Sequence, residues 1–190
     1  EISFFNDAAI GIAPSPAELE NYALRMGLAP LPPMPAAVWL RDSGYIRIES
    51  GPCVVMIDVA RIGPDYLPGH AHADTLSFEM SLNGRRVVVN SGTSTYAAGE
   101  ERLRQRGTAA HNTVVMDGRN SSEVWGGFRV ARRARPLSAS LDADGRRITV
   151  KGAHDGYCRL HGSALHERTW TVTPDGLTIA DRVGWAESVA

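Results

Sequence analysis

Pairs of short alternating segments, each joined by a tight-turn signal, constrain the fold of this chain more than any other feature. The turn signals are Asp42-Ser43-Gly44, Asn83-Gly84, Asp144-Gly145 and Pro174-Asp175-Gly176. Asn-Gly and Asp-Gly accept the positive φ angles of tight hairpin turns and therefore favour antiparallel neighbours. Many short strands without helical patterns between them predict an all-β, antiparallel β-sandwich or a related architecture.

The most regular hairpin pattern lies around Asn83-Gly84. Apolar Leu76, Phe78, Met80 and Leu82 alternate with polar Ser77, Glu79 and Ser81. This pattern predicts a strand with one buried face, followed by a return strand at residues 87–89. A strict two-residue turn pairs Ser77 with Asn90, whereas a bulge shifts the register by one and moves Asn90 to the other face. Residues 113–116 (TVVM) and 53–60 (CVVMIDVA) are two further expected strands.

The N-terminal part has a different character. Ser15, Pro16 and Glu18 match the N-cap, first position and third position of a helix, and Gly27 can end it. Residues 29–36 are rich in proline and predict a stiff linker. We expect residues 1–30 to be a helical connector from a preceding domain, and residues 31–190 to be the β-domain. The helix would pack on that domain or on the preceding one, and the chain would be a segment of a longer protein.

Composition excludes several classes of function. The net charge of -1 gives no electrostatic reason to expect binding to nucleic acid or to a membrane surface. No apolar run approaches the roughly 20 residues that a membrane-spanning helix needs. The two cysteines, Cys53 and Cys158, lack a C-x-x-C spacing, which favours free thiols over a disulfide or a metal site.

Three of the six histidines fall near the central hairpin, at positions 70, 72 and 111. His70-x-His72 places two imidazoles on one side of an extended segment. Zinc needs three or four converging ligands, so His72 and His111 are candidates, with Asp74 or Asn90 as a third. Spacing alone favours ordinary hydrogen-bonded histidines over a metal site.

Arginines form the other candidate cluster. Arg102, Arg104 and Arg106 alternate in a polar segment, which predicts either a solvated loop or a surface that recognises carboxylate or sulfate groups. Trp125 is a candidate for stacking on a substrate. The solvent face of a strand fits Arg129, Arg132 and Arg133 better than a substrate contact does. His154 lies among the later strands, and a structural role fits it better than a functional one.

Two stretches of the sequence carry a resemblance to a known family. They read HAHADTLSFEMSLNGRRVVVNSGTSTY from His70 and RLRQRGTAAHNTVVMDGRNSSEVWGGFRVARRARP from Arg102. Together they resemble the heparinase II/III-like polysaccharide lyases over roughly residues 38–190. FFNDAAIGIAPSPAELENYALRMGL, at residues 4–28, resembles the connector that leaves the helical domain of that family.

The resemblance implies an α/α-toroid domain before the β-sandwich, with a cleft between them that cleaves uronic-acid-containing chains by β-elimination. It implies that His70 faces the substrate, that Tyr96 lies where some members place a catalytic tyrosine, and that His72 and His111 match two ligands of a zinc ion found in some members. The third ligand there is an Asp, at the position of Asn90. It also implies a periplasmic or secreted location.

We therefore expect the C-terminal domain of a lyase acting on a glycosaminoglycan- or alginate-like polymer. In this hypothesis His70 and Tyr96 are catalytic, Arg102, Arg106 and Trp125 bind substrate, and His72, Asn90 and His111 bind zinc. The partners are the acidic polysaccharide and the missing toroid of the same chain, and the isolated chain would be inactive. The alternative is a non-catalytic module that binds carbohydrate or a partner domain.

Overall fold

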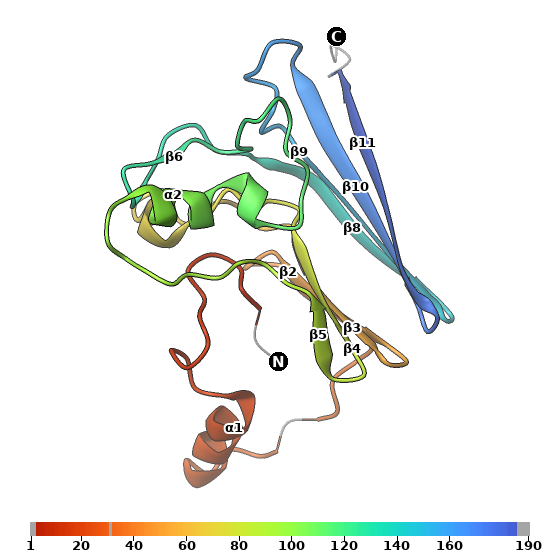
Figure 1. The fold of residues 1–190 in the computed structure, drawn as a ribbon. Coiled ribbons are helices and arrows are strands. Elements are labelled where there is room, and N and C mark those ends of the chain that lie inside the picture. The colour runs from red at the N-terminus through yellow and green to blue at the C-terminus, as the bar shows by residue number, and fades with distance from the viewer. Residues whose placement is uncertain (1–2, 31, 186–190) are drawn as a thin grey trace.

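The computed structural model describes residues 3–30 and 32–185, which form two antiparallel β-sheets (Figure 1). The first sheet has the order β1-β2-β3-β4-β5. Its strands are β1 (Ala37–Leu40), β2 (Tyr45–Ser50), β3 (Cys53–Asp58), β4 (Phe78–Leu82) and β5 (Arg85–Val88). The second sheet has the order β11-β10-β9-β8. Its strands are β8 (Pro136–Asp144), β9 (Arg147–His154), β10 (Ala164–Thr173) and β11 (Gly176–Trp185).

The remaining strands and helices of the chain are short. Strands β6 (Val124–Trp125) and β7 (Arg129–Val130) pair with each other. The helices are α1 (Pro16–Arg25), α2 (Glu100–Arg106) and the 3-10 turns η1 (Pro68–His70) and η2 (Thr108–Ala110). No helix among the described residues is long and apolar enough to cross a membrane.

One hydrophobic core lies between the sheets. The first sheet contributes Ile46, Ile48, Val55 and Ile57, and the second contributes Val150, Trp170 and Val172. All seven side chains are essentially inaccessible to solvent. Two antiparallel sheets packed through their inner faces confirm the predicted β-sandwich.

The predicted hairpins are confirmed. The four turn signals connect β1 to β2, β4 to β5, β8 to β9, and β10 to β11. Asn83 and Gly84 have φ angles of 52° and 73°. Leu82 pairs with Arg85 and Ser81 with Arg86, but Met80 pairs with Val88, so Val87 is the extra residue of a bulge. This bulge is the register shift that moves Asn90 to the other face of the sheet.

Two strand predictions need correction. Strand β4 has polar residues buried on its second face as well, because the N-terminal segment covers that face: the backbone N–H of Phe4 donates to Glu79 Oε1 at 3.0 Å, and Glu79 and Ser81 are buried. Leu76 lies outside the strand because its φ of 63° breaks the extended conformation. Residues 113–116 are not a strand; within the described residues, only an isolated bridge from Met116 to Arg119 pairs them.

The N-terminal helix has the predicted ends. Ser15 and Glu18 form a reciprocal capping box, Pro16 opens the helix, and Gly27 follows its C-cap with a φ of 80°. None of its residues is buried, and Figure 1 shows α1 standing apart from the sheets. The alternative in which α1 packs on the β-domain is therefore wrong, whereas packing on a preceding domain stays a prediction, as does the boundary after residue 30.

Candidate functional site

Asp7, from the N-terminal segment, is the centre of a buried polar cluster. Its carboxylate accepts a hydrogen bond from His72 Nε2 at 2.7 Å and another from His70 Nδ1 at 2.8 Å. Arg102 donates to both carboxylate oxygens through its two terminal nitrogens. Thr93 Oγ1 donates to Oδ1 at 3.1 Å. One carboxylate thus joins segments that lie 63 to 95 residues away in the sequence.

These contacts fix the charge and proton positions at the site. Burial raises the pKa of Asp7, but hydrogen bonds from His72, Arg102 and His70 outweigh it and hold the pKa well below the usual 3.8. The carboxylate is therefore ionised and can only accept hydrogen bonds. Consequently His70 carries a proton on Nδ1 and His72 carries one on Nε2. In a neutral ring the lone pair then lies on His70 Nε2 and on His72 Nδ1.

A candidate metal site lies on the inner side of this cluster. His72 Nδ1 lies 3.2 Å from His111 Nε2, and Asp74 completes a buried group whose ligand atoms lie within 4.8 Å of one another. Two imidazole nitrogens bound tetrahedrally to zinc at about 2.0 to 2.1 Å lie roughly 3.3 Å apart, which matches this pair. Burial lowers the pKa of His111 to about 4, so its ring stays in the neutral form that binds metal. The residues present fit a divalent cation such as zinc.

For His72 a second contact also fits a metal site. Metal-bound histidines commonly donate their other ring N–H to a carboxylate, as His72 does to Asp7. His111 has no such contact, since its Nδ1 is buried without a hydrogen-bond partner among the described residues. In a second histidine pair of the same fold, the corresponding ring nitrogen has a hydrogen-bond partner.

That second pair is His154, the last residue of β9, and His166, its partner on β10. His154 Nε2 lies 3.1 Å from His166 Nδ1, and His166 Nε2 lies 2.7 Å from Asp181 Oδ1. Arg168 donates to both oxygens of Asp181. The order His–His–Asp–Arg is the same as in the first cluster, but here the chain is closed because the N–H of Gly156 donates to His154 Nδ1 at 3.0 Å. This closed chain is a structural network.

Asn90 lies beside the metal group but has other partners. Its Oδ1 accepts hydrogen bonds from the backbone N–H and the side-chain Nδ2 of Asn112, at 3.1 and 3.3 Å. Its own N–H donates to Glu79 Oε1 at 2.9 Å. The acidic residue that the structure brings to the two histidines is Asp74, the alternative that the spacing offered. The Oδ2 atom of Asp74 also accepts from the N–H of Asn6 at 3.0 Å.

On the outer side, the cluster presents an imidazole to solvent. The His70 side chain is 65% exposed, while the Asp7 side chain that holds it is 5% exposed. Tyr96 is half exposed and meets the His70 ring edge to face at 6.0 Å, and Phe128 lies 6.2 Å from Tyr96. The buried guanidinium of Arg102 supports both aromatic rings, at 5.2 and 5.3 Å from their centroids.

The arginines differ most from the sequence-based picture. Residues 100–106 form helix α2 rather than a solvated loop, so Arg102 and Arg106 share one face and Arg104 points elsewhere. Arg102 and Arg106 are fully buried. Arg106 Nε donates to the carbonyl of Ala71 at 2.9 Å, and its other nitrogens reach the carbonyls of Arg129 and Pro68. In this structure both guanidinium groups hold the site together, and neither is presented to an external anion.

The other basic and aromatic candidates lie at the surface. Trp125 is half exposed, with the guanidinium of Arg129 4.9 Å from its ring centroid. Arg129 is the only one of Arg129, Arg132 and Arg133 that lies in a described strand, so the prediction of a single strand face for all three is wrong. Arg133 instead binds Asp65 at 2.7 Å.

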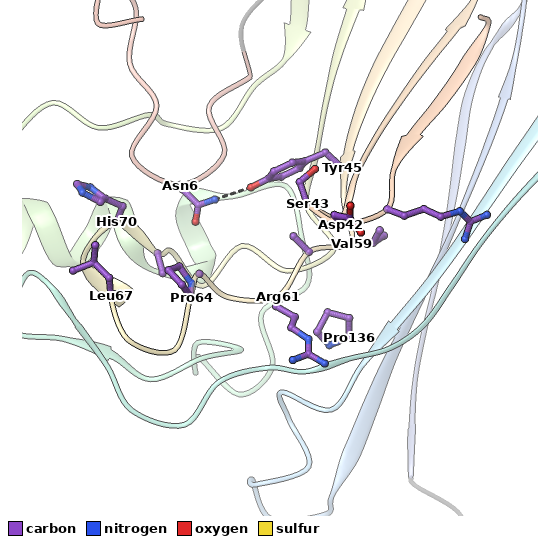
Figure 2. Close-up of a pocket in the computed structure, with 15 residues that line it drawn as sticks. Asn6, Asp42, Ser43, Tyr45, Val59, Arg61, Pro64, Leu67, His70 and Pro136 are labelled. Carbon is purple, nitrogen blue, oxygen red and sulfur yellow. Dashed lines mark hydrogen bonds between the residues drawn. The ribbon is translucent and has the colours of Figure 1, made fainter.

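A pocket of about 720 Å³ opens beside His70 (Figure 2). Figure 2 shows His70 and Leu67 on one side of it and Arg61 and Pro136 on the other. Asn6 lines the pocket and donates to the hydroxyl of Tyr45 at 2.9 Å. The exposed imidazole therefore lies at the border of a space that can accept a ligand.

Sequence reasoning missed Asn6 and Asp7. Both lie in residues 1–30, which the sequence predicts to be a connector from a preceding domain. The available signal was the presence of two adjacent polar residues inside the run SFFNDAAI. Such a pair is costly to bury unless each residue has partners, and here each has several.

Comparison with known proteins agrees with the fold. The model of the family described as "Heparinase II/III-like, C-terminal" matches residues 32–188. A crystal structure of heparinase III is similar with a TM-score of 0.67 and 20% identity, over 95% of this chain and 30% of that one. A heparan sulfate lyase from Pedobacter heparinus is similar with a TM-score of 0.69 and 17% identity, over 95% of this chain and 29% of that one. No curated protein matches the sequence.

Proposed function

Because the chain belongs to the heparinase II/III-like C-terminal family, we propose that it forms one wall of the active site of a polysaccharide lyase. The substrate is a uronic-acid-containing polysaccharide, of the glycosaminoglycan or alginate type, and the reaction is β-elimination. The chain spans about 30% of the heparinase III structure that it resembles. In this proposal the remaining groups of the site come from a preceding α/α-toroid domain, and the enzyme acts in the periplasm or outside the cell.

The observation that carries this proposal is the fixed, exposed imidazole of His70. β-Elimination requires a group that neutralises the uronate carboxylate, a base that removes the C5 proton and an acid that protonates the leaving oxygen. His70 Nδ1 is held by Asp7 at 2.8 Å, so Nε2 is the atom presented to a ligand. When Nε2 is protonated, it donates to the substrate, either to polarise the carboxylate or to protonate the leaving oxygen.

Tyr96 is the second catalytic candidate because it contacts His70 at the same surface. Its ring packs on the buried guanidinium of Arg102, which limits its motion. The phenol supplies a hydroxyl that can exchange a proton with the substrate beside His70.

The metal group stabilises this surface from behind. His72, His111 and Asp74 would hold a zinc ion, with Asn90 as a neutral residue beside them. When bound, zinc supplies a positive charge that keeps the loops of His72 and His111 in one arrangement. The link to the reacting surface is Asp7, which holds both His72 and His70.

The test is His70→Ala in the full-length enzyme. A positioned acid or base contributes roughly a hundredfold to ten-thousandfold in rate, so kcat should fall by about that factor while substrate affinity changes little. His161→Ala, at an exposed histidine in the loop between β9 and β10, is the matched control and should leave turnover unchanged. Unchanged turnover in the His70 variant contradicts the catalytic role.

A non-catalytic carbohydrate-binding module is the second candidate. The exposed aromatic side chains of Tyr96, Phe128 and Trp125 favour it, since sugar-binding surfaces use such rings. The same experiment separates the two functions. If the chain is a non-catalytic module, the His70→Ala variant should keep both turnover and carbohydrate binding. A Tyr96→Ala variant should bind carbohydrate more weakly.

A further inference from the structure

A groove lined by arginines continues from the pocket beside His70. The pocket of about 720 Å³ and a second groove of about 1180 Å³ share four lining residues, namely Arg61, Gly63, Pro64 and Pro136. Asn6 and His70 line only the pocket, and Arg159 lines only the second groove, so the shared residues lie at the border between the two. Figure 2 shows Arg61 and Pro136 on the side of the pocket away from His70.

The second groove has a strong local charge. It is lined by five arginines and two aspartates, although the whole chain has a net charge of -1. The arginines are Arg61, Arg132, Arg133, Arg135 and Arg159. A concave surface lined by one sign of charge concentrates the field and attracts ligands of the opposite sign.

Two of these arginines build the walls of the groove. Arg133 donates to the carbonyls of Ile62 and Pro64 and binds Asp65, which holds the 62–65 loop in place. Arg159 donates to the carbonyls of Asn120, Ser121 and Gly156. Because these two guanidinium groups are satisfied internally, they shape the groove rather than attract a ligand.

Two of the other three arginines are free to bind a ligand, and the third is largely exposed. Arg61 and Arg135 are exposed, and their side chains make no hydrogen bond or ion pair with any residue that the structure describes. Arg132 has a 72% exposed side chain and only a 3.3 Å contact with Glu123. A guanidinium binds carboxylate and sulfate groups through paired, charge-assisted hydrogen bonds.

We propose that this groove binds the anionic units of the polysaccharide that lie next to the unit held at His70. This inference deepens the proposed function and rests on it for the identity of the polymer. Arg61 and Arg135 make the main contacts with the carboxylate or sulfate groups, and Arg132 adds a weaker one. The groove thus holds a polymer rather than a single sugar, because its two parts extend away from His70.

The test is binding of a fluorescently labelled heparin oligosaccharide to the 190-residue chain, followed by anisotropy. The double variant Arg61→Gln/Arg135→Gln should bind roughly tenfold more weakly or worse, since it loses two charge-assisted contacts. Arg85→Gln/Arg146→Gln makes the same change in net charge at exposed positions in two hairpins outside the groove, and should stay within about twofold of the unaltered chain.

Competitors identify the recognised group. Displacement by unlabelled alginate oligosaccharide shows that carboxylates suffice, and failure of alginate to compete shows that sulfates are required; either result supports the groove. Neutral dextran should not compete. Equal losses in the two double variants, or no binding of heparin at all, overturn the proposal.

The two proposals fail separately. If the groove variants bind normally but His70→Ala abolishes turnover in the full-length enzyme, the groove is wrong and the lyase site stands. If His70→Ala leaves turnover unchanged while the groove variants still weaken binding, the groove stands and the catalytic role is wrong.

Discussion

At the scale of single residues, Asp7 decides whether the site is formed. It is the anion that compensates the fully buried guanidinium of Arg102, and it also orients His70 and His72. Removing one partner of a buried ion pair is costly because the other charge stays buried and unpaired.

Asp7→Ala should therefore lower the free energy of unfolding of the chain by about 3 kcal/mol or more, measured by urea denaturation. Glu101→Ala removes a carboxylate of the same charge from the exposed pair with Arg104, and should have little effect. If the two variants are equally stable, Asp7 is not the centre of the cluster.

The candidate metal site allows a second prediction about a single residue, Asn90. Asn90→Asp places a carboxylate beside His72 and His111, where the resemblance indicates an acidic ligand. We expect zinc affinity to rise roughly tenfold or more, measured by competition with a chromophoric chelator. The metal-free variant should be less stable because it buries an extra negative charge. Asn83→Asp, in the exposed turn between β4 and β5, is the matched control and should change neither property.

The candidate residues were only partly predictable from sequence. The sequence offered His72 and His111 as candidate ligands of one zinc ion, although spacing alone favoured ordinary hydrogen-bonded histidines, and the structure places their nitrogens 3.2 Å apart. Asp7 was not predictable because its partners lie up to 95 residues away and no local pattern links them. Contacts of this kind depend on how the N-terminal segment returns over β4.

At the scale of elements, Arg168 on β10 connects the second sheet to the loops of the site. Its Nη1 donates to the carbonyl of Leu76 at 2.9 Å and to that of Asn112 at 2.5 Å, while Nε and Nη2 bind Asp181 on β11. Leu76 has a positive φ, which an L-residue rarely adopts, so these contacts hold a strained turn two residues after Asp74.

Arg168→Lys should destabilise the chain by about 2 kcal/mol, because an ammonium group cannot bind the carboxylate and both carbonyls in one planar arrangement. Thermal and urea unfolding measure the change. Arg182→Lys is the control, since Arg182 lies on β11, is 82% exposed and lies 3.7 Å from Glu167. Equal stability of the two variants would show that Arg168 does not support the turn.

The elements differ in how well the sequence predicts them. Helix α1 was predictable because its start is encoded locally by Ser15, Pro16 and Glu18. Helix α2 was not, because the face it buries carries Arg102 and Arg106 and therefore has no hydrophobic periodicity. Residues 113–116 have the composition of a strand, but they lack a partner strand among the described residues, and composition cannot supply one.

At the scale of the whole molecule, buried histidines make stability depend on pH. Burial first, and then the neighbouring His166, Arg168 and Arg159, lower the pKa of His154 to about 3. Between about pH 6.5 and 3 the unfolded chain binds a proton at this position that the folded chain does not. Stability therefore falls as the pH falls through this window. The lowered pKa of Asp181 acts only below the usual 3.8, so it does not contribute between pH 7 and 5.

We expect the free energy of unfolding of the metal-free chain to be roughly 1 to 2 kcal/mol lower at pH 5 than at pH 7 on account of His154. Urea denaturation at several pH values measures the slope. His154→Gln should give a flatter dependence that keeps only the share of the remaining buried histidines, whatever its absolute stability. An unchanged slope in this variant would contradict the assignment.

The division of the active site between two domains gives the last prediction. His70 and Tyr96 offer two groups for the chemistry and the arginine groove offers binding, but β-elimination needs a carboxylate-neutralising group, a base and an acid, so one of the three must come from the opposite side of the cleft. The isolated 190-residue chain should therefore bind an acidic polysaccharide without cleaving it. The absorbance of the unsaturated uronate product should stay at background with the chain alone and rise with the full-length enzyme at the same concentration. Robust product formation by the chain alone would show that the described residues contain a complete site, and that no second domain is required for the chemistry.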